Sequence, residues 1–365
     1  MKILMIARAT LYSSPGGDTV QILKTASFLR DLDVKVDVVL ANKVLAYTDY
    51  DLIHFFNIIR PSDILPHIKG LVVPFVVSTI YVDYSEYEKQ NRTGFSGFVS
   101  RILTSDQLEY LKVIARFVKN GDKINSIDYL MKGHRKSVQY VAEQASMLLP
   151  NSHSEYKRLS IDYDINVPYQ KVVNAIDPSV FSSEAGTNND YQNYVLTVGR
   201  IEGRKNQLNL IRALAGTGLK LAIIGKPSPN HMDYYEQCKM LAKEKGNVEF
   251  IEHIEHVELV KIYKAAKVHV LPSWFETTGL SSLEAAVMDC NIVVSPKGDT
   301  EEYFQNMCYY CDPDNVGSIK EAVLKAYNAP VNTEIKKFVL DNYTWNRTAE
   351  QTLEAYKNVL KNNIS

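Results

Sequence analysis

The feature that most constrains the fold is an alternation of short apolar runs with amphipathic segments, which recurs in both halves of the chain. The apolar runs of the first half are K-I-L-M-I-A, V-K-V-D-V-V-L, D-L-I-H-F-F and V-V-P-F-V-V-S-T, with a helical pattern at about 18–30. Those of the second half are Y-V-L-T-V, L-K-L-A-I-I-G, V-E-F-I, V-H-V-L-P and N-I-V-V-S, with helical patterns at 206–215 and 280–288. Such alternation is typical of parallel βαβ units. We therefore predict an α/β protein with two doubly wound sheets.

A chain of 365 residues exceeds the size at which one hydrophobic core keeps growing, which favours two domains. Residues 182–190 are rich in Ser, Gly, Asn and Asp and have no apolar periodicity, so they indicate a linker. We predict Rossmann-like domains at 1–182 and 183–342. Residues 343–365 have helical spacing, and the sequence leaves open whether this helix returns to the first domain.

The stretch at about 85–139 breaks the alternation and has mostly helical spacing beside basic residues, among them the cluster M-K-G-H-R-K. One interpretation is an element that binds an acceptor or touches a membrane surface. The other is an inserted helical pair that packs on its own domain, because most amphipathic helices face a core. The sequence leaves both open.

Composition and the N-terminus exclude several classes of protein. The formal net charge of -1 gives no basic surplus for nucleic-acid binding. Arg8 interrupts the first apolar run, so no export signal is expected there. The longest mainly apolar stretch, 71–80, has about half of the ~20 residues that a membrane-spanning helix needs. Four cysteines are too few for a disulfide framework. We expect a cytoplasmic protein.

Two glutamates, Glu276 and Glu284, bracket the segment E-T-T-G-L-S-S-L-E after an apolar strand. A helix is expected to begin at Gly279 and Leu280, where free backbone N–H groups can hold phosphate oxygens. If the segment were wholly helical, its carboxylates would lie ~12 Å apart along the axis, more than in a glycoside hydrolase acid/base pair. The spacing therefore favours one carboxylate at each end of an extended ligand.

Three basic residues, Arg200, Arg204 and Lys205, follow the strand Y-V-L-T-V in R-I-E-G-R-K-N. Arginine offers a planar fork for phosphate oxygens and lysine a movable point charge, so together they suit a diphosphate. Four D-x-D triplets occur, but none adjoins these segments and the basic residues already supply the charge. We expect no metal and no cofactor.

Four motifs carry a resemblance to a known family: G-R-I-E-G-R-K-N, E-T-T-G-L-S-S-L-E, P-S-W-F before it, and Y-T-W near Trp345. They resemble the retaining glycosyltransferases of GT-B architecture, the group 1 glycosyl transferases, in which two Rossmann-like domains face each other across a central cleft. The resemblance implies that Glu284 binds ribose hydroxyls and Glu276 contacts the transferred sugar. It also implies that Arg200 and Lys205 hold the pyrophosphate, with Arg204, Thr278, Gly279 and Leu280 as further substrate-binding candidates.

The first half resembles the family less closely. P-G-G-D, with Gly16 and Gly17 before an expected Asp18 helix cap, is similar to the family's glycine loop. His54 keeps one histidine of an H-x-H pattern found in many relatives, and Tyr81 stands where a later histidine is expected. His54 is a candidate catalytic residue and Tyr81 a candidate for substrate binding. A satisfied strand-end histidine remains an equal alternative for His54.

The sequence thus predicts transfer of a sugar from a nucleotide diphosphate sugar to an acceptor hydroxyl, with retained configuration and without metal. The acceptor would be a sugar or a lipid-linked sugar in cell-surface polysaccharide or glycolipid synthesis, with peripheral contact at the cytoplasmic membrane face left open. Two alternatives remain: a nucleotide-sugar epimerase or hydrolase on the same fold, and a non-catalytic nucleotide-sugar-binding module. A dehydrogenase is disfavoured because the first strand lacks G-x-G-x-x-G.

Overall fold

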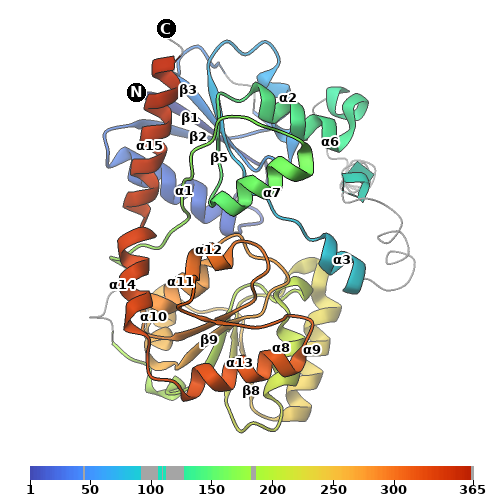
Figure 1. Cartoon of the computed structure of the whole chain (residues 1–365), viewed down its shortest axis with the longest axis vertical. Helices are drawn as coiled ribbons and strands as arrows, with labels where there is room; N and C mark the ends of the chain where they lie inside the picture. The colour runs from blue at the N-terminus through green and yellow to red at the C-terminus, as the bar shows by residue number, and fades with distance from the viewer. Residues whose placement is uncertain (44–45, 92–105, 109, 112–126, 182–185, 363–365) are drawn as a thin grey trace. The chain divides into compact units, whose positions relative to one another are not determined.

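The computed structural model describes the whole chain except residues 44–45, 92–105, 109, 112–126, 182–185 and 363–365 (Figure 1). It divides into two compact units. Unit 1 comprises Met1–Tyr81, Glu88–Asn174 and Trp345–Ser365; unit 2 comprises Val82–Tyr87 and Ala175–Thr344. Much of the stretch expected to be a helical insertion, and part of the expected linker, lie outside the described residues.

Unit 1 contains a five-stranded parallel sheet in the order β2-β1-β3-β4-β5. Its strands are β1 (Lys2–Ala7), β2 (Lys35–Leu40), β3 (Leu52–Phe56), β4 (Phe75–Ser78) and β5 (Met147–Leu149). Its helices are α1 (Gly17–Arg30), α2 (Pro61–Ile68), α6 (Ile127–Gln144), α7 (His153–Tyr163) and α15 (Trp345–Asn362), together with the end of α3 (Ser85–Asn91). Helix α1 begins within a residue of its predicted start.

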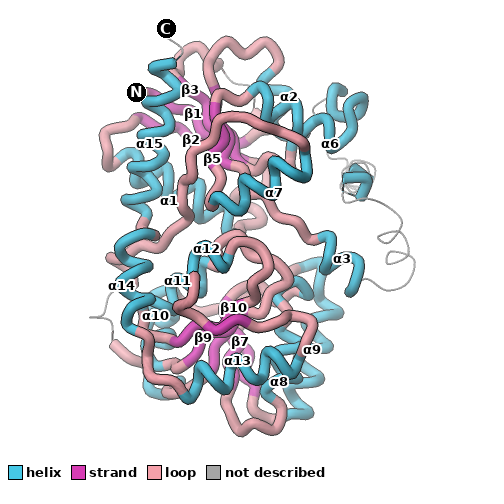
Figure 2. The backbone as a smooth tube through the Cα atoms, viewed as in Figure 1, coloured by secondary structure: helices cyan, strands magenta, loops and turns pink. Residues whose placement is uncertain are grey.

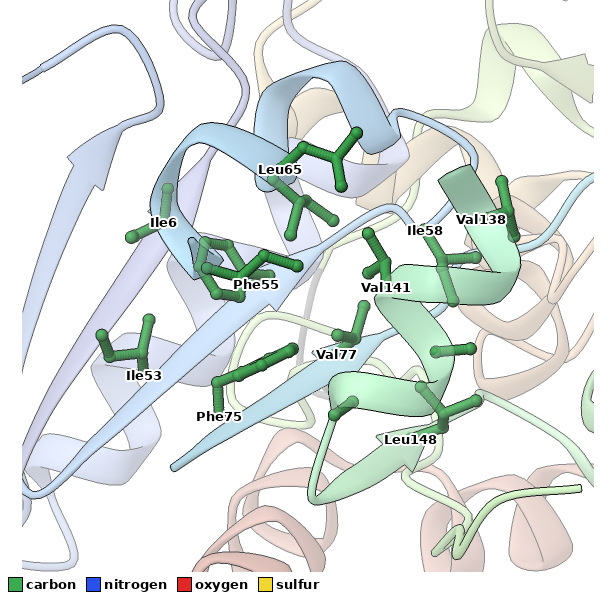
Figure 3. Packing of buried hydrophobic residues seen from close by; sticks show 14 of the residues in the cluster. Ile6, Ile53, Phe55, Ile58, Leu65, Phe75, Val77, Val138, Val141 and Leu148 are labelled. Carbon is green, nitrogen blue, oxygen red and sulfur yellow. The ribbon is translucent and has the colours of Figure 1, made fainter. Parts of the chain in front are cut away.

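Both faces of this sheet are buried. Successive residues of a strand point to opposite faces, and both sets belong to hydrophobic clusters. On one face Ile6, Phe55 and Val77 pack against α2, α6 and α7, as Figure 3 shows for α2 and α6. On the other face Met5 and Val76 pack against α1 and α15. This double burial explains why the strands read as continuous apolar runs in the sequence.

Unit 2 contains a six-stranded parallel sheet in the order β11-β10-β9-β6-β7-β8. Its strands are β6 (Val195–Val198), β7 (Leu221–Ile224), β8 (Val248–Ile251), β9 (Val268–Leu271), β10 (Asn291–Val294) and β11 (Tyr309–Tyr310). Its helices are α8 (Gln207–Leu214), α9 (Met232–Lys245), α10 (His256–Ala265), α11 (Leu280–Val287), α12 (Thr300–Phe304), α13 (Val316–Asn328) and α14 (Thr333–Asn342). Short 3-10 turns occur at Asn189–Tyr191, Gly203–Lys205 and Pro229–His231. In each unit, helices flank the strands (Figure 2).

Apart from the short segment Val82–Tyr87, which belongs to unit 2, the chain crosses between the units twice. It passes from unit 1 to unit 2 between Asn174 and Ala175, upstream of the boundary expected at 182, and returns between Thr344 and Trp345. The two crossings are adjacent in unit 2, where the N–H of Ile176 donates to the carbonyl of Tyr343 at 3.0 Å. Helix α15 then packs on α1 within unit 1. The terminal helix therefore returns to the first domain, one of the two arrangements that the sequence left open. None of the helices described here is long and apolar enough to cross a membrane.

Candidate nucleotide-sugar site

The connections of unit 2 place two predicted motifs at one edge of its sheet. Strands β6 and β9 are neighbours, and the chain order runs outward from them in opposite directions. Ligands of open α/β sheets bind beyond the carboxyl ends of the strands at such a switch point. The loop after β6 carries Arg200, Arg204 and Lys205, and the loop after β9 carries Glu276 and Thr278. The topology thus brings together the two segments that the sequence identified.

Backbone contacts hold these two loops side by side. The side chain of Asn206 donates to the carbonyl of Pro272 at 3.0 Å, and the N–H of Trp274 donates to the carbonyl of Arg204 at 2.9 Å. Asn206 has a left-handed φ of 64°, which asparagine tolerates better than most residues. The basic residues after β6 are therefore positioned directly against the loop after β9.

A glycine missed by the sequence reasoning supports Glu276 from the opposite side. The carbonyl of Glu276 accepts a hydrogen bond from the N–H of Asp299 at 2.8 Å, and its own N–H donates to the carbonyl of Lys297 at 3.2 Å. Gly298 lies between these partners with φ of 95°, and a Cβ there would stand 2.1 Å from the Glu276 carbonyl oxygen. Gly298 opens the motif G-D-T-E-E-Y, and a glycine is required there by this close approach.

The charged side chains of the site form two ion pairs. Lys205 Nζ lies 2.5 Å from Glu276 Oε1, and Arg204 Nη2 lies 3.0 Å from Glu202 Oε1. Burial alone would raise the pKa of Glu202, but the guanidinium groups of Arg204 and Arg200 outweigh it, so the pKa is lowered. Arg200 itself is exposed. The result is a cluster of cations at the strand ends, with Glu276 held among them.

Glu284 lies one turn into α11, which begins at Leu280 as predicted and is capped by Gly279 with a left-handed φ of 72°. Desolvation raises the pKa of Glu284 to about 7, although the hydroxyl of Tyr263 donates to Glu284 Oε2 at 3.2 Å and opposes this shift. The side chain keeps partial exposure. A carboxylate with one protein donor and a raised pKa has acceptor capacity left for ligand hydroxyls.

The loop after β9 also contains polar atoms without hydrogen-bond partners among the described residues. They are Ser273 Oγ, Trp274 Nε1 and Thr278 Oγ1, and each residue is at most 3% exposed. Buried polar groups are nearly always paired, so three such atoms within six residues indicate partners supplied by a ligand or water. The sequence predicted Thr278; Ser273 and Trp274 were signalled only by the strand-end motif P-S-W-F.

The glycine loop of unit 1 differs in detail from the expectation. Helix α1 begins at Gly17 with Gly16 as its N-cap, so the prediction of Asp18 as the cap is wrong. Asp18 lies in the first turn, where its carboxylate binds Arg8 through Nε at 2.5 Å and Nη2 at 3.0 Å. The backbone does not require glycine at 17: its φ is negative, and no atom lies within 4 Å of an added Cβ. Substrate binding by Gly16 and Gly17 stays a prediction.

The two other candidates in unit 1 are buried and satisfied. His54 is 1% exposed; Nδ1 lies 2.7 Å from the hydroxyl of Tyr356 and Nε2 lies 2.8 Å from Ser78 Oγ. Desolvation lowers the pKa of His54 to about 3. Tyr81 donates its backbone N–H to Glu155 and its hydroxyl to Asp162 at 2.7 and 2.6 Å. This geometry supports the structural alternative for His54 and gives Tyr81 a structural role too.

The sheets and their connections define the class of protein: two Rossmann-like domains, the GT-B fold. Residues 181–343 match the model of the family described as "Glycosyl transferases group 1". This segment covers most of unit 2 and less than half of the chain, so the second half of the chain resembles that family. The match includes both loops of the site at β6 and β9.

Curated relatives agree with this assignment. The chain is 29% identical over 207 residues to an uncharacterized glycosyltransferase of Methanocaldococcus jannaschii, covering 54% of this chain and 51% of that protein. It is 26% identical over 235 residues to N-acetylgalactosamine-N,N'-diacetylbacillosaminyl-diphospho-undecaprenol 4-alpha-N-acetylgalactosaminyltransferase of Campylobacter jejuni, covering 59% of this chain and 61% of that protein. The chain thus spans between half and two thirds of the length of these relatives.

Solved structures show the same fold over nearly the whole chain. Sucrose-phosphate synthase from Thermosynechococcus elongatus matches with a TM-score of 0.75 at 15% identity, covering 99% of both chains. HepE of Anabaena in complex with UDP matches with a TM-score of 0.72 at 14% identity, covering 98% of this chain and all of that one. At these identities the likeness establishes the fold alone.

Proposed function

We propose that this chain transfers a sugar from a nucleotide diphosphate sugar to an acceptor hydroxyl, with retention of anomeric configuration. The observation that carries the proposal is the Lys205–Glu276 pair at the switch point, beside buried polar atoms that have no hydrogen-bond partner among the described residues. Arg200 and Lys205 would hold the diphosphate, Glu284 the ribose hydroxyls and Glu276 the transferred sugar. The match of residues 181–343 to the group 1 family model, and the UDP and UDP-glucose in HepE structures, support this class of donor.

The reaction exchanges one bond at the anomeric carbon and transfers one proton. The bond from the sugar's anomeric carbon to the β-phosphate oxygen breaks, and a bond from that carbon to the acceptor oxygen forms on the same face. The leaving phosphate takes the acceptor's proton, while Lys205, Arg200 and the start of α11 stabilise its negative charge. Protein cations supply this charge, so we propose that transfer needs no metal.

We propose a lipid-linked sugar as the acceptor, presented at the cytoplasmic face of a membrane. The Campylobacter relative carries diphospho-undecaprenol in its name. At the start of α6, Leu130 and Met131 are 40% and 80% exposed, beside the exposed residues Lys132, Arg135 and Lys136. Exposed apolar side chains next to basic ones suit a peripheral contact with anionic lipid.

Ligand binding and turnover test the donor proposal. We expect one of UDP, GDP, ADP and dTDP, with chelator present, to raise the unfolding midpoint of the wild type. A ligand at about 100 times its Kd adds about 2.7 kcal/mol. Glu284→Ala should reduce that shift, and the matching nucleotide sugar should then be consumed only when an acceptor is added.

The outcomes separate the alternatives. Consumption of the nucleotide sugar without acceptor would indicate an epimerase or hydrolase. Binding without turnover across the acceptors, lipid-linked sugars included, would indicate a binding module. No shift with any of the four nucleotides would overturn the proposed site.

A further inference from the structure

A short piece of the first half of the sequence packs within unit 2. Residues Val82–Tyr87, V-D-Y-S-E-Y, follow Tyr81 in the chain, yet cluster with Ala175–Thr344. Three of its six side chains contact loops that carry or support the candidate site. The periodic pattern of the sequence gave no sign of this segment.

Tyr84 contacts the basic loop directly. Its ring centroid lies 4.1 Å from Cζ of Arg204 and 6.0 Å from the ring of Phe275, which it meets edge-on. Burial raises the pKa of Tyr84, so the phenol stays protonated, and the charges of Arg204, Glu276 and Lys205 all act on it. Arg204 is thereby held by a ring on its face and by Glu202 at its edge. A stacked guanidinium keeps its remaining N–H donors in a fixed plane.

Tyr87 contacts the loops after β6 and β9, and Glu86 contacts the loop after β10. The ring of Tyr87 lies 6.1 Å from that of Trp274, and a Cβ on Gly203 would stand 1.9 Å from the Tyr87 hydroxyl oxygen. The φ of Gly203 is not positive, so Tyr87 rather than the backbone accounts for this glycine. Glu86 binds Lys297 Nζ at 2.8 Å, and the Lys297 carbonyl accepts the N–H of Glu276.

We propose that Val82–Tyr87 is a positioning element of the donor site, in which the ring of Tyr84 fixes the guanidinium plane of Arg204 for the diphosphate. Tyr87 and Glu86 hold the Gly203–Lys205 turn and the Glu276 backbone against it. The site that selects a nucleotide diphosphate is therefore built from both halves of the sequence. This inference rests on the proposed function.

The test compares diphosphates with monophosphates. Affinities of UDP, GDP, ADP and dTDP, each beside its nucleoside monophosphate, are measured for the wild type, Tyr84→Phe and Tyr84→Leu. We expect Tyr84→Leu to weaken diphosphate binding ~5- to 30-fold, the range of a partly to fully desolvated cation–π contact, with monophosphate affinity nearly unchanged. Tyr84→Phe keeps the ring face and should bind like the wild type.

A matched control and a double mutant guard against misfolding. Tyr194→Leu removes a ring that lies 5.3 Å from Lys220 Nζ elsewhere in unit 2, and should leave both affinities unchanged. In the wild-type background, Gly203→Ala should weaken diphosphate binding, because the added Cβ clashes with the Tyr87 hydroxyl. In a Tyr87→Leu background the same substitution should weaken binding much less, because that clash is removed.

Three results would overturn this inference without affecting the proposed function. The first is a wild-type preference for diphosphates in Tyr84→Leu. The second is tighter diphosphate binding by that variant, which would mean that Tyr84 obstructs the site. The third is equal losses for diphosphate and monophosphate, which would reduce the segment to a structural role. If no nucleotide binds the wild type, the proposed function fails and this inference fails with it.

Discussion

The two units have the same kind of sheet, but the candidate side chains of unit 1 are paired within the described part of the protein, whereas several polar groups in the loop after β9 of unit 2 are not. In unit 1, both ring nitrogens of His54 are hydrogen-bonded, to Tyr356 and Ser78, and the hydroxyl of Tyr81 donates a hydrogen bond to Asp162. In unit 2, the buried hydroxyl groups of Ser273 and Thr278, in the loop after β9, have no hydrogen-bond partner among the described residues. A satisfied buried group adds to stability, whereas an unsatisfied one costs free energy until a ligand pairs with it. The comparison therefore supports the proposed donor site in unit 2 over one built on His54 and Tyr81.

The largest expected effect follows from removing the cation beside Glu276. Lys205→Met should lower kcat/KM for sugar transfer by ~10²- to 10³-fold, the usual loss when one preorganised group that stabilises developing charge is removed. The measurement is steady-state kinetics with the nucleotide sugar that the wild type consumes.

Two variants separate this loss from a loss of stability. Lys205→Met leaves a buried carboxylate without its partner, so Glu276→Gln in the same chain should restore much of the unfolding midpoint without restoring transfer. Lys336→Met breaks an ion pair of unit 2, 2.8 Å to Asp289, outside the site loops and should leave transfer unchanged. Near-normal transfer in Lys205→Met would remove the main reason for placing the diphosphate there.

A smaller effect is expected from the pH dependence of Glu284. Its pKa is raised to about 7 in the folded protein. If the carboxylate accepts ribose hydroxyls, nucleotide affinity of the wild type should rise about tenfold from pH 6 to pH 8, as the ionised fraction rises. Nucleotide affinities of Glu284→Gln, measured at the same pH values, correct for the ionisation of the nucleotide itself. This variant should lack the part of the rise in affinity that is due to Glu284.

The contribution of Glu284 to the free energy of unfolding should fall with rising pH, opposite to its effect on nucleotide affinity. A pKa raised above its unfolded value favours folding while the group is protonated, so this contribution is complete below about pH 4.5 and is lost as pH rises through about 7. Relative to Glu284→Gln, the wild type should lose on the order of 1–3 kcal/mol across that window. Parallel stability curves for the two proteins would show that Glu284 has an ordinary pKa.

The sequence predicted the local parts of this molecule well. Helix α8 was expected at 206–215 and spans Gln207–Leu214; α11 was expected from Leu280 and begins there. Apolar periodicity and glycine positions determine such elements over a few residues. The structure also brings the two motifs of the predicted site together, because the order of the strands places the loops after β6 and β9 at one edge of the sheet.

Contacts between distant residues could not be predicted in the same way. His54 meets Tyr356 302 residues away, and Tyr84 joins unit 2 although its neighbour Tyr81 belongs to unit 1. Nothing in the local spacing of these residues specifies such partners. Gly203 and Gly298 did carry a signal, since each glycine marks the close approach of another segment.

The smallest effect on the reaction is expected at His54, and this variant tests unit 1's side of the comparison. His54→Leu leaves the Tyr356 hydroxyl and Ser78 Oγ without their partner, which should cost ~2–4 kcal/mol of folding free energy. Because the pKa of His54 is lowered to about 3, its contribution is present above about pH 6.5 and is lost as pH falls toward 3. The variant should therefore lose most stability near neutral pH, while kcat per folded molecule stays within about twofold.

Tyr81→Phe, which removes one hydroxyl contact to Asp162, should cost about 1 kcal/mol of folding free energy and likewise leave kcat unchanged. A large fall in kcat for folded His54→Leu, with Tyr81→Phe normal, would instead make His54 a catalytic residue and break the contrast between the two units.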